Sequence, residues 1–184
     1  MNIPNKLTIV RVIMVPFFVA AFLMGTTAGN WAALVLFVAA GLTDTLDGMI
    51  ARKYNMVTSF GKLMDPLADK LMVMAALVCF TYTGVVHPAV TIVILAREFL
   101  VTGLRMLATT SGRVIAADIW GKLKTVFQDI GIIVTLAWKA LEHAKFAPVL
   151  KAVSTGCIWI MTVLTIVSAV NYCVKNHDVF CDIK

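Results

Sequence analysis

Residues 44–69 read DTLDGMIARKYNMVTSFGKLMDPLAD, and this stretch places four aspartates inside segments that are otherwise apolar. They are Asp44, Asp47, Asp65 and Asp69. On helices of about 3.6 residues per turn, the first two share one face and the last two share another. An ionised side chain at membrane depth is disfavoured by several kcal/mol, so such groups face a polar cavity and have partners. Two facing helices would therefore bring four carboxylates together.

The residue types of this cluster favour hard divalent cations. Four close carboxylates repel one another unless cations neutralise them. Oxygen ligands without Cys or His suit Mg2+, Mn2+ or Ca2+ rather than Zn2+ or copper, and four acids suffice for two bridged ions. Two metal ions at a membrane surface suit displacement at phosphorus. The alternative is that the acids cap helix ends beside a loop, which would explain one Asp better than four in register with Gly48, Ala51 and Arg52.

Composition assigns the chain to the integral membrane proteins. Hydrophobic residues make up 60% of its 184 residues and charged residues 14%, whereas soluble domains are about a quarter charged. This length predicts one domain over residues 1–184. At about 20 apolar residues per span, it supplies about six helices. We therefore predict an all-α integral membrane protein with six transmembrane helices and a short N-terminal interfacial amphipathic helix.

The apolar pattern gives approximate bounds for these elements. We interpret the N-terminal apolar run as mature structure, because no clear small-x-small cleavage site follows it and further spans come later. An interfacial piece from Pro4 to about Val10 leads into a first span that ends at Met24. The later spans are predicted over 31–53, 62–86, 88–109, 117–138 and 152–174. Both acidic faces then lie near the same membrane surface.

The distribution of basic residues predicts the orientation. With a cytoplasmic N-terminus, six spans leave only Lys139, Lys145 and Lys151 outside, out of 16 Lys and Arg. The positive-inside rule then places the acidic cluster at the cytoplasmic face. A net charge of +6 suits anionic lipid head groups and phosphorylated substrates. Because the basic residues are scattered over span ends, we predict no nucleic-acid partner.

The acidic stretch resembles the signature of the CDP-alcohol phosphatidyltransferases at every fixed position. The matching residues are Asp44, Asp47, Gly48, Ala51, Arg52, Gly61, Asp65 and Asp69. These membrane enzymes displace CMP from a CDP-linked lipid or alcohol with a hydroxyl nucleophile and a divalent metal. The resemblance implies that the four acids hold two Mg2+ or Mn2+ ions and that Asp69 is the general base. It also implies a homodimer, and a nucleotide site lined by Gly48, Ala51, Arg52 and Gly61.

The N-terminal segment adds two candidate nucleotide-binding residues, Asn5 and Thr8. Together with Arg11 they occur at i, i+3 and i+6, roughly on one face of a helix. Ordinary helix capping and an interfacial anchor explain this face as well as a ligand role does.

Three further segments resemble bacterial phosphatidylglycerophosphate synthases. They are NIPNKLTIVR (2–11), AREFLVTGLR (96–105) and GKLKT (121–125), so the resemblance covers about the first 125 residues. It implies CDP-diacylglycerol and sn-glycerol 3-phosphate as substrates, with phosphatidylglycerophosphate and CMP as products. It also implies a cytoplasm-facing site in the plasma membrane of a bacterium.

The basic residues inside the predicted spans suit a phosphate group. Arg97 and Arg105 are eight residues apart, nearly on one face, and the planar guanidinium pairs with phosphate. The alternative is that Arg97 and Glu98 neutralise each other inside the bundle. Lys122 and Lys124 face different ways, so one of them can simply extend its charged end to the membrane interface without binding a ligand. The resemblance makes Arg97, Arg105, Lys122 and Lys124 the candidate glycerol-3-phosphate ligands.

Two rival functions remain open on the sequence. Another acceptor, such as an inositol phosphate, serine or phosphatidylglycerol, could replace glycerol 3-phosphate, although the second resemblance argues against it. A divalent-cation transporter could also use four membrane carboxylates. However, a transporter is expected to show broken helices or internal repeats near the midplane.

Overall fold

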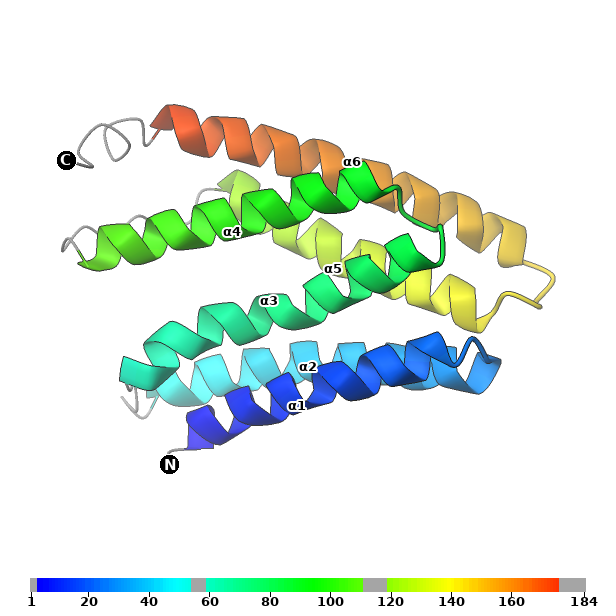
Figure 1. The fold of residues 1–184 in the computed structure, drawn as a ribbon, viewed down its shortest axis with the longest axis horizontal. Helices are drawn as coiled ribbons and strands as arrows, with labels where there is room; N and C mark the ends of the chain where they lie inside the picture. Colours follow the sequence, from blue (N-terminus) through cyan, green and yellow to red (C-terminus); the bar gives the residue numbers. More distant parts are fainter. Residues whose placement is uncertain (1–2, 54–58, 111–118, 176–184) are drawn as a thin grey trace.

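The computed structural model describes residues 3–53, 59–110 and 119–175, and within them the side chains of 7–43, 67–68, 70–106 and 119–175. These ranges form six α-helices and no strand. They are α1 (Ile3–Leu23), α2 (Thr27–Lys53), α3 (Ser59–Tyr82), α4 (Pro88–Thr110), α5 (Ile119–Ala140) and α6 (Ala147–Lys175). All six lie along one common direction (Figure 1). The all-α prediction is confirmed.

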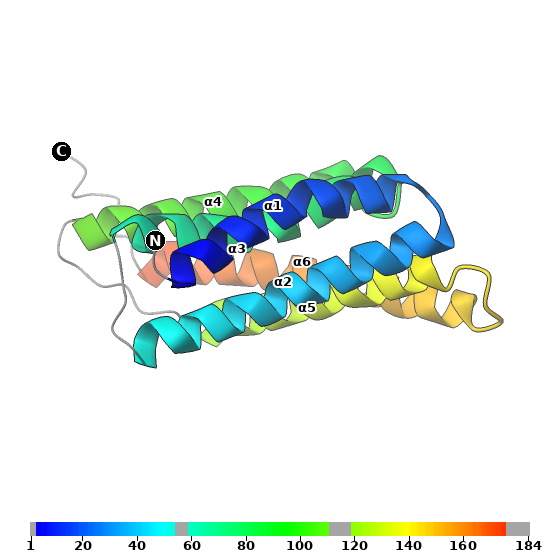
Figure 2. The same cartoon turned by 90° about the horizontal axis from the view of Figure 1, so that it is seen from below.

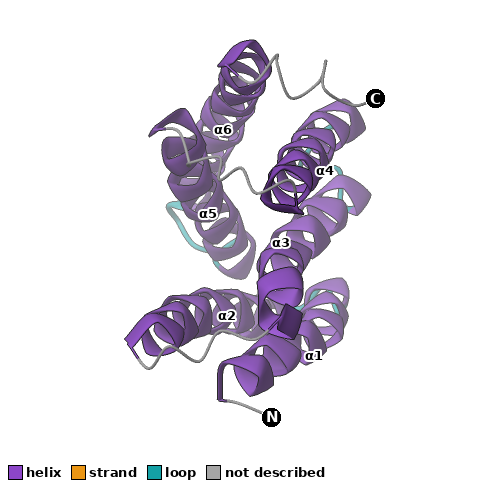
Figure 3. Cartoon of the chain, turned by 90° about the vertical axis from the view of Figure 1, so that its left-hand side faces the viewer, coloured by secondary structure: helices purple, strands orange, loops and turns teal. Residues whose placement is uncertain are grey.

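Helix α3 occupies the middle of the bundle. It packs against α1 and α2 on one side and against α4 and α5 on the other, while α6 packs against α4 and α5. The end-on view in Figure 3 shows this arrangement. The start of α1, the end of α2, the start of α3 and the end of α6 lie at one end of the bundle, which we call the N-terminal end (Figures 1 and 2). The α1–α2, α3–α4 and α5–α6 connections lie at the opposite end.

Several predicted bounds are wrong by about one turn. Helix α2 begins at Thr27 instead of residue 31, because the Thr26 hydroxyl accepts the Gly29 backbone N–H at 3.1 Å and caps the helix. Helix α3 ends at Tyr82 instead of residue 86. Helix α6 begins at Ala147 instead of residue 152.

The bounds of the other helices agree more closely with the sequence. Helix α4 spans Pro88–Thr110, close to the predicted 88–109. Helix α5 is described from Ile119 to Ala140. The predicted interfacial piece is continuous with the first span in a single helix α1, which contains Pro16. Its position at the membrane interface stays a prediction.

Two glycines make the tight turns at the end opposite the N-terminal end. Gly25 and Gly84 have φ values of 64° and 71°, a backbone conformation that residues with a Cβ rarely adopt. After α3, the Val85 N–H donates to the Phe80 carbonyl at 2.8 Å and the Gly84 N–H donates to the Thr81 carbonyl at 3.1 Å. This pattern is a Schellman cap. It explains why α3 stops before residue 86.

Aromatic packing joins the first three helices. Phe18 lies 6.3 Å from Phe37 on α2, and Phe22 lies 5.6 Å from Phe80 on α3, between ring centroids. Phe18, Phe22, Phe37 and Phe80 are all buried. Such edge-on and tilted contacts are favoured geometries for aromatic pairs. This contact fixes the position of α3 against α1 and α2.

Hydrogen bonds between small polar side chains join the remaining helices. The Thr81 and Thr91 hydroxyls lie 2.6 Å apart and connect α3 with α4. The Thr135 and Ser154 hydroxyls lie 2.7 Å apart and connect α5 with α6. Small residues that approach closely and bond across helices are typical of membrane helix packing.

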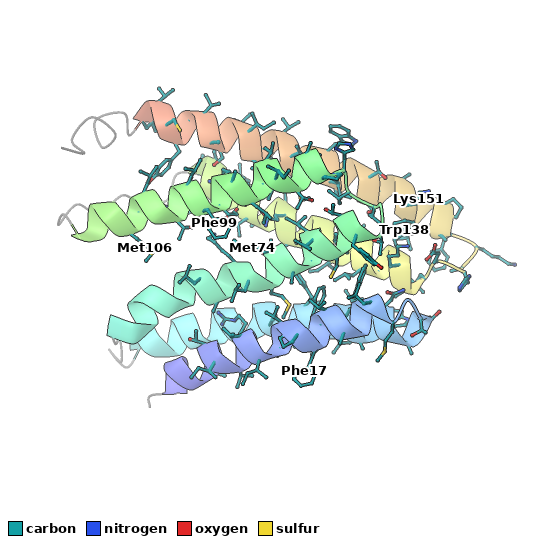
Figure 4. The ribbon with its side chains drawn as sticks, in the orientation of Figure 1. Phe17, Met74, Phe99, Met106, Trp138 and Lys151 are labelled. Atoms are coloured by element: carbon teal, nitrogen blue, oxygen red, sulfur yellow. The ribbon has the colours of Figure 1, made fainter. Side chains whose placement is uncertain are left out.

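The outer surface of the bundle carries many large apolar side chains. Phe17, Leu100 and Trp159 are each more than 60% exposed, and Figure 4 shows Phe17 pointing away from the bundle. Apolar surface of this extent marks contact with a membrane or a partner. Among the described residues, α6 is the one helix long and apolar enough to cross a membrane by length and composition. The six-span count therefore stays a prediction.

Candidate functional site

The two acidic segments meet at the N-terminal end of the bundle. Asp44 and Asp47 belong to the C-terminal part of α2, and Asp65 and Asp69 to the N-terminal half of α3. Because both backbones are helical, each pair has the spacing of a shared face. The end of α2 and the start of α3 lie at the same end of the bundle (Figure 1). The sequence prediction that both segments lie near one surface agrees with this arrangement.

The side chains of most motif residues lie outside the described residues, and this applies to Asn5, Asp44, Asp47, Gly48, Ala51, Arg52, Gly61, Asp65 and Asp69. Among the side chains that the structure does describe, no group of three His, Cys, Asp or Glu residues could hold a metal ion. The four aspartates are an all-oxygen donor set, which fits Mg2+ or Mn2+. The metal site stays a prediction on this chemistry.

A buried charged cluster crosses the bundle beside the acidic segment of α3. Glu98 on α4 accepts a hydrogen bond from the Lys70 Nζ on α3 at 2.5 Å and forms an ion pair with Lys124 on α5. The Arg97 Nη1 lies 3.6 Å from the Glu98 Oε1. The side chains of Arg97, Glu98 and Lys124 are less than 10% exposed, and that of Lys70 is 25% exposed. We call Lys70, Arg97, Glu98 and Lys124 the interior charge cluster.

Arg97 is also held from the far side of the bundle. Its Nη2 donates to the Ser168 Oγ on α6 at 2.6 Å. Arg97 passes close to Gly121 on α5, where an added Cβ would lie 3.6 Å from the Nη2. This distance is an ordinary van der Waals contact, so the methyl group of an alanine would fit beside the guanidinium. Arg97 thus extends from α4 to α6 beside α5.

The other candidate phosphate ligands differ in burial. Arg105, two turns after Arg97, lies over the Tyr172 ring on α6 with its Cζ 5.9 Å from the ring centroid. Lys124 is buried in the interior charge cluster, whereas Lys122 is exposed. Lys122 is therefore the surface lysine of the two, and Lys124 the interior one.

The N-terminal helix contributes further buried polar groups. Thr8 and Arg11, three residues apart on α1, are each 2% exposed. A side chain that anchors a helix at the head-group surface is expected to be accessible. Burial thus disfavours the anchor interpretation for these two residues. The nucleotide-binding role of Asn5 and Thr8 stays a prediction.

The interior charge cluster carries three cationic side chains and one carboxylate. Glu98 can neutralise one of the three positive charges. Excess buried charge is costly, so a charged group inside a bundle usually has a counter-ion. Guanidinium and ammonium groups gathered in this way are suited to binding an anion such as phosphate. The alternative in which Arg97 and Glu98 simply neutralise each other does not account for the ion pairs of Glu98 with Lys70 and Lys124.

Sequence reasoning missed two members of this site. Lys70 follows Asp69 directly and begins an apolar run, and a lysine at such a position was a signal that it faces polar partners. Ser168 gave no signal, because a serine in an apolar helix commonly bonds its own backbone.

Comparisons with known proteins agree on one protein family. The family model described as CDP-alcohol phosphatidyltransferase matches residues 1–170. The chain is 37% identical to a Bacillus subtilis protein over 96% of both chains, and 36% identical to an Escherichia coli protein over 93% of this chain and 92% of that protein. A Rickettsia felis protein is 35% identical over 93% of both chains. All three are named CDP-diacylglycerol–glycerol-3-phosphate 3-phosphatidyltransferase.

These matches extend further along the chain than the motifs do. The short segments that carry the resemblance end near residue 125, whereas the family model continues to residue 170. The match therefore includes α5 and most of α6, whose Ser168 contacts Arg97. The chain belongs to the CDP-alcohol phosphatidyltransferase family.

Proposed function

We propose that the protein transfers the phosphatidyl group from CDP-diacylglycerol to sn-glycerol 3-phosphate, giving phosphatidylglycerophosphate and CMP. The observation that carries this proposal is the interior charge cluster, in which Lys70, Arg97 and Lys124 surround one carboxylate. The phosphate monoester of the acceptor would bind to these cationic side chains. The names of the relatives agree with this acceptor.

The phosphate of the acceptor would bind to Arg97, Lys124 and Arg105, with Lys70 as a further cation. Charge-assisted hydrogen bonds from guanidinium and ammonium groups to phosphate are among the strongest in proteins. Lys122 is exposed, so it would add attraction for the dianion from a distance. Arg52, Gly48, Ala51, Gly61, Asn5 and Thr8 would bind the CDP part of the donor.

The acidic residues would carry the chemistry. Asp44, Asp47, Asp65 and Asp69 would hold two divalent cations, Mg2+ or Mn2+. When bound, these ions supply charge stabilisation at the pyrophosphate of the donor. Asp69 would accept the proton from the 1-hydroxyl of glycerol 3-phosphate. The hydroxyl oxygen then forms a bond to the phosphorus that carries the diacylglycerol, and the P–O bond to CMP breaks, with its electron pair leaving on CMP.

The membrane setting follows from the family and the apolar surface. We propose a single domain over residues 1–184 with six membrane spans in the plasma membrane of a bacterium. The N-terminal end of the bundle would face the cytoplasm, and the active site would open there. The lipid tails of the donor would remain in the bilayer. The protein would act as a homodimer, as the family resemblance implies.

The test is CMP release by the detergent-purified protein. CDP-diacylglycerol is supplied with glycerol 3-phosphate, an inositol phosphate, serine or phosphatidylglycerol, each with Mg2+ or Mn2+ and with EDTA. We expect activity with glycerol 3-phosphate, and we expect EDTA and Asp69→Asn to abolish it. Activity with a different acceptor alone would leave the family assignment intact but refute the proposed role of the interior charge cluster. Folded protein that releases no CMP with any acceptor would refute the proposal entirely.

A further inference from the structure

Glu98 is the centre of the interior charge cluster. Its two carboxylate oxygens contact cations from α3, α4 and α5: Lys70 at Oε2, and Arg97 and Lys124 at Oε1. Its side chain is 4% exposed. This one carboxylate therefore contacts three long, flexible cationic side chains that come from three helices.

We infer that Glu98 is a positioning residue for the acceptor, holding Lys70, Arg97 and Lys124 in the arrangement that the phosphate of glycerol 3-phosphate meets. This inference rests on the proposed function. Three cations brought together without Glu98 would repel one another and spread apart. Lysine and arginine side chains also lose considerable conformational freedom when a ligand orders them. Holding them in place before the acceptor arrives reduces the free-energy cost of binding.

Glu98 also connects the acceptor site to the helix that carries the proposed base. Its hydrogen-bond partner Lys70 directly follows Asp69 on α3, and Lys70 is 28 residues from Glu98 in sequence. The Lys70–Glu98 bond therefore joins α4 to α3 beside Asp69. A misplacement of about 1 Å between reacting groups can reduce rate about 100-fold. Loss of this bond should therefore affect kcat as well as acceptor binding.

A role in positioning predicts the opposite sign from a role in charge balance. If Glu98 only lowered the positive charge of the cluster, Glu98→Gln would add net positive charge and strengthen binding of the dianionic acceptor. If Glu98 positions the cations, the same variant weakens acceptor binding although the electrostatic attraction has increased. Glu98→Asp sharpens the distinction, because it keeps the charge but shortens the side chain by one methylene.

The experiment measures KM and kcat for both substrates in detergent-purified parent, Glu98→Gln and Glu98→Asp. We expect the KM for glycerol 3-phosphate to rise about tenfold or more in both variants, with kcat reduced and the KM for CDP-diacylglycerol changed by less than about twofold. Glu142→Gln is the matched control, because Glu142 is exposed and pairs with Lys139 at 3.5 Å at the opposite end of the bundle. We expect parent kinetics for it.

The outcomes separate this inference from the proposed function. A parent that does not use glycerol 3-phosphate refutes the proposed function, whatever the variants do. A parent that uses it, with an unchanged or lower KM for glycerol 3-phosphate in Glu98→Gln, refutes the positioning role alone, and so does parent-like behaviour of Glu98→Asp.

A second variant covers the case in which the changes at Glu98 prevent folding. Lys70→Gln removes the positive charge from the same α3–α4 ion pair, at a side chain that is 25% exposed, where substitution is tolerated better than in the buried core. We expect a rise of about tenfold in the KM for glycerol 3-phosphate and a lower kcat. Parent values for both constants in folded Lys70→Gln would overturn the inference.

Discussion

Replacing Lys124 by Met should separate the two lysines that the sequence could not distinguish. Lys124 is 1% exposed and pairs with Glu98 inside the bundle, whereas Lys122 is exposed. Methionine keeps most of the length and apolar volume of the lysine stem and removes the charge. Glu98 retains Lys70 and Arg97 as partners in this variant. The substitution therefore does not leave a buried carboxylate without a counter-ion.

The expected magnitude follows from the lost interaction with the acceptor phosphate. A hydrogen bond to a charged group contributes about 1.5–3 kcal/mol, and about 1.4 kcal/mol corresponds to a factor of ten. Lys124→Met should therefore raise the KM for glycerol 3-phosphate by about 10- to 100-fold. Lys122→Met should raise it by only about two- to threefold, because an exposed charge acts through solvent.

The assay is steady-state CMP release with either substrate varied and the other saturating. Lys145→Met is a control for general effects of removing a lysine, since Lys145 is exposed in the α5–α6 connection at the opposite end of the bundle. The KM for CDP-diacylglycerol should change little in all three variants. Equal effects at Lys122 and Lys124, or an effect of Lys124→Met confined to CDP-diacylglycerol, would refute the reasoning.

Two further predictions concern the helices that support the site. Ser168→Ala removes the 2.6 Å bond that holds Arg97, so the KM for glycerol 3-phosphate should rise about fivefold. Ser154→Ala, which removes a buried 2.7 Å bond on the same helix, should lower thermal stability but not change that KM; a similar KM for both variants would contradict the role of Ser168. Gly84→Ala should reduce the free energy of unfolding by about 1 kcal/mol, because Gly84 has a φ of 71° and alanine is strained there. Gly103→Ala, in open space within α4, should not reduce it in the same denaturation experiment, and equal losses would exclude the backbone explanation.

The sequence predicted the fold class and the end of the bundle where the motif lies, because both depend on local signals. Long apolar runs separated by short turns predict helices, and the spacing of Asp44, Asp47, Asp65 and Asp69 predicts shared helical faces. The bounds were less accurate where a cap decided them. Thr26 extends α2 at its start, and Gly84 ends α3 early.

The partners within the site could not be predicted, because they depend on how the helices pack. Neighbouring sequence positions made Arg97 and Glu98 a plausible pair. The structure contains this pair at 3.6 Å, and it also joins Glu98 to Lys70 and Lys124 on other helices. Arg97 is joined to Ser168, which is 71 residues away in sequence. Such contacts across several helices follow from the position of α3 and α5 in the bundle, which no local pattern of residues encodes.

The most direct test of the central claim compares glycerol 3-phosphate with glycerol as acceptor in the parent protein. Both offer the same primary hydroxyl group, and only the first carries the phosphate that the interior charge cluster is proposed to bind. At equal acceptor concentration with Mg2+ or Mn2+, CMP release from CDP-diacylglycerol should be at least about 100-fold faster with glycerol 3-phosphate. Equal rates with the two acceptors would show that Lys70, Arg97 and Lys124 do not recognise the acceptor, and would contradict the account.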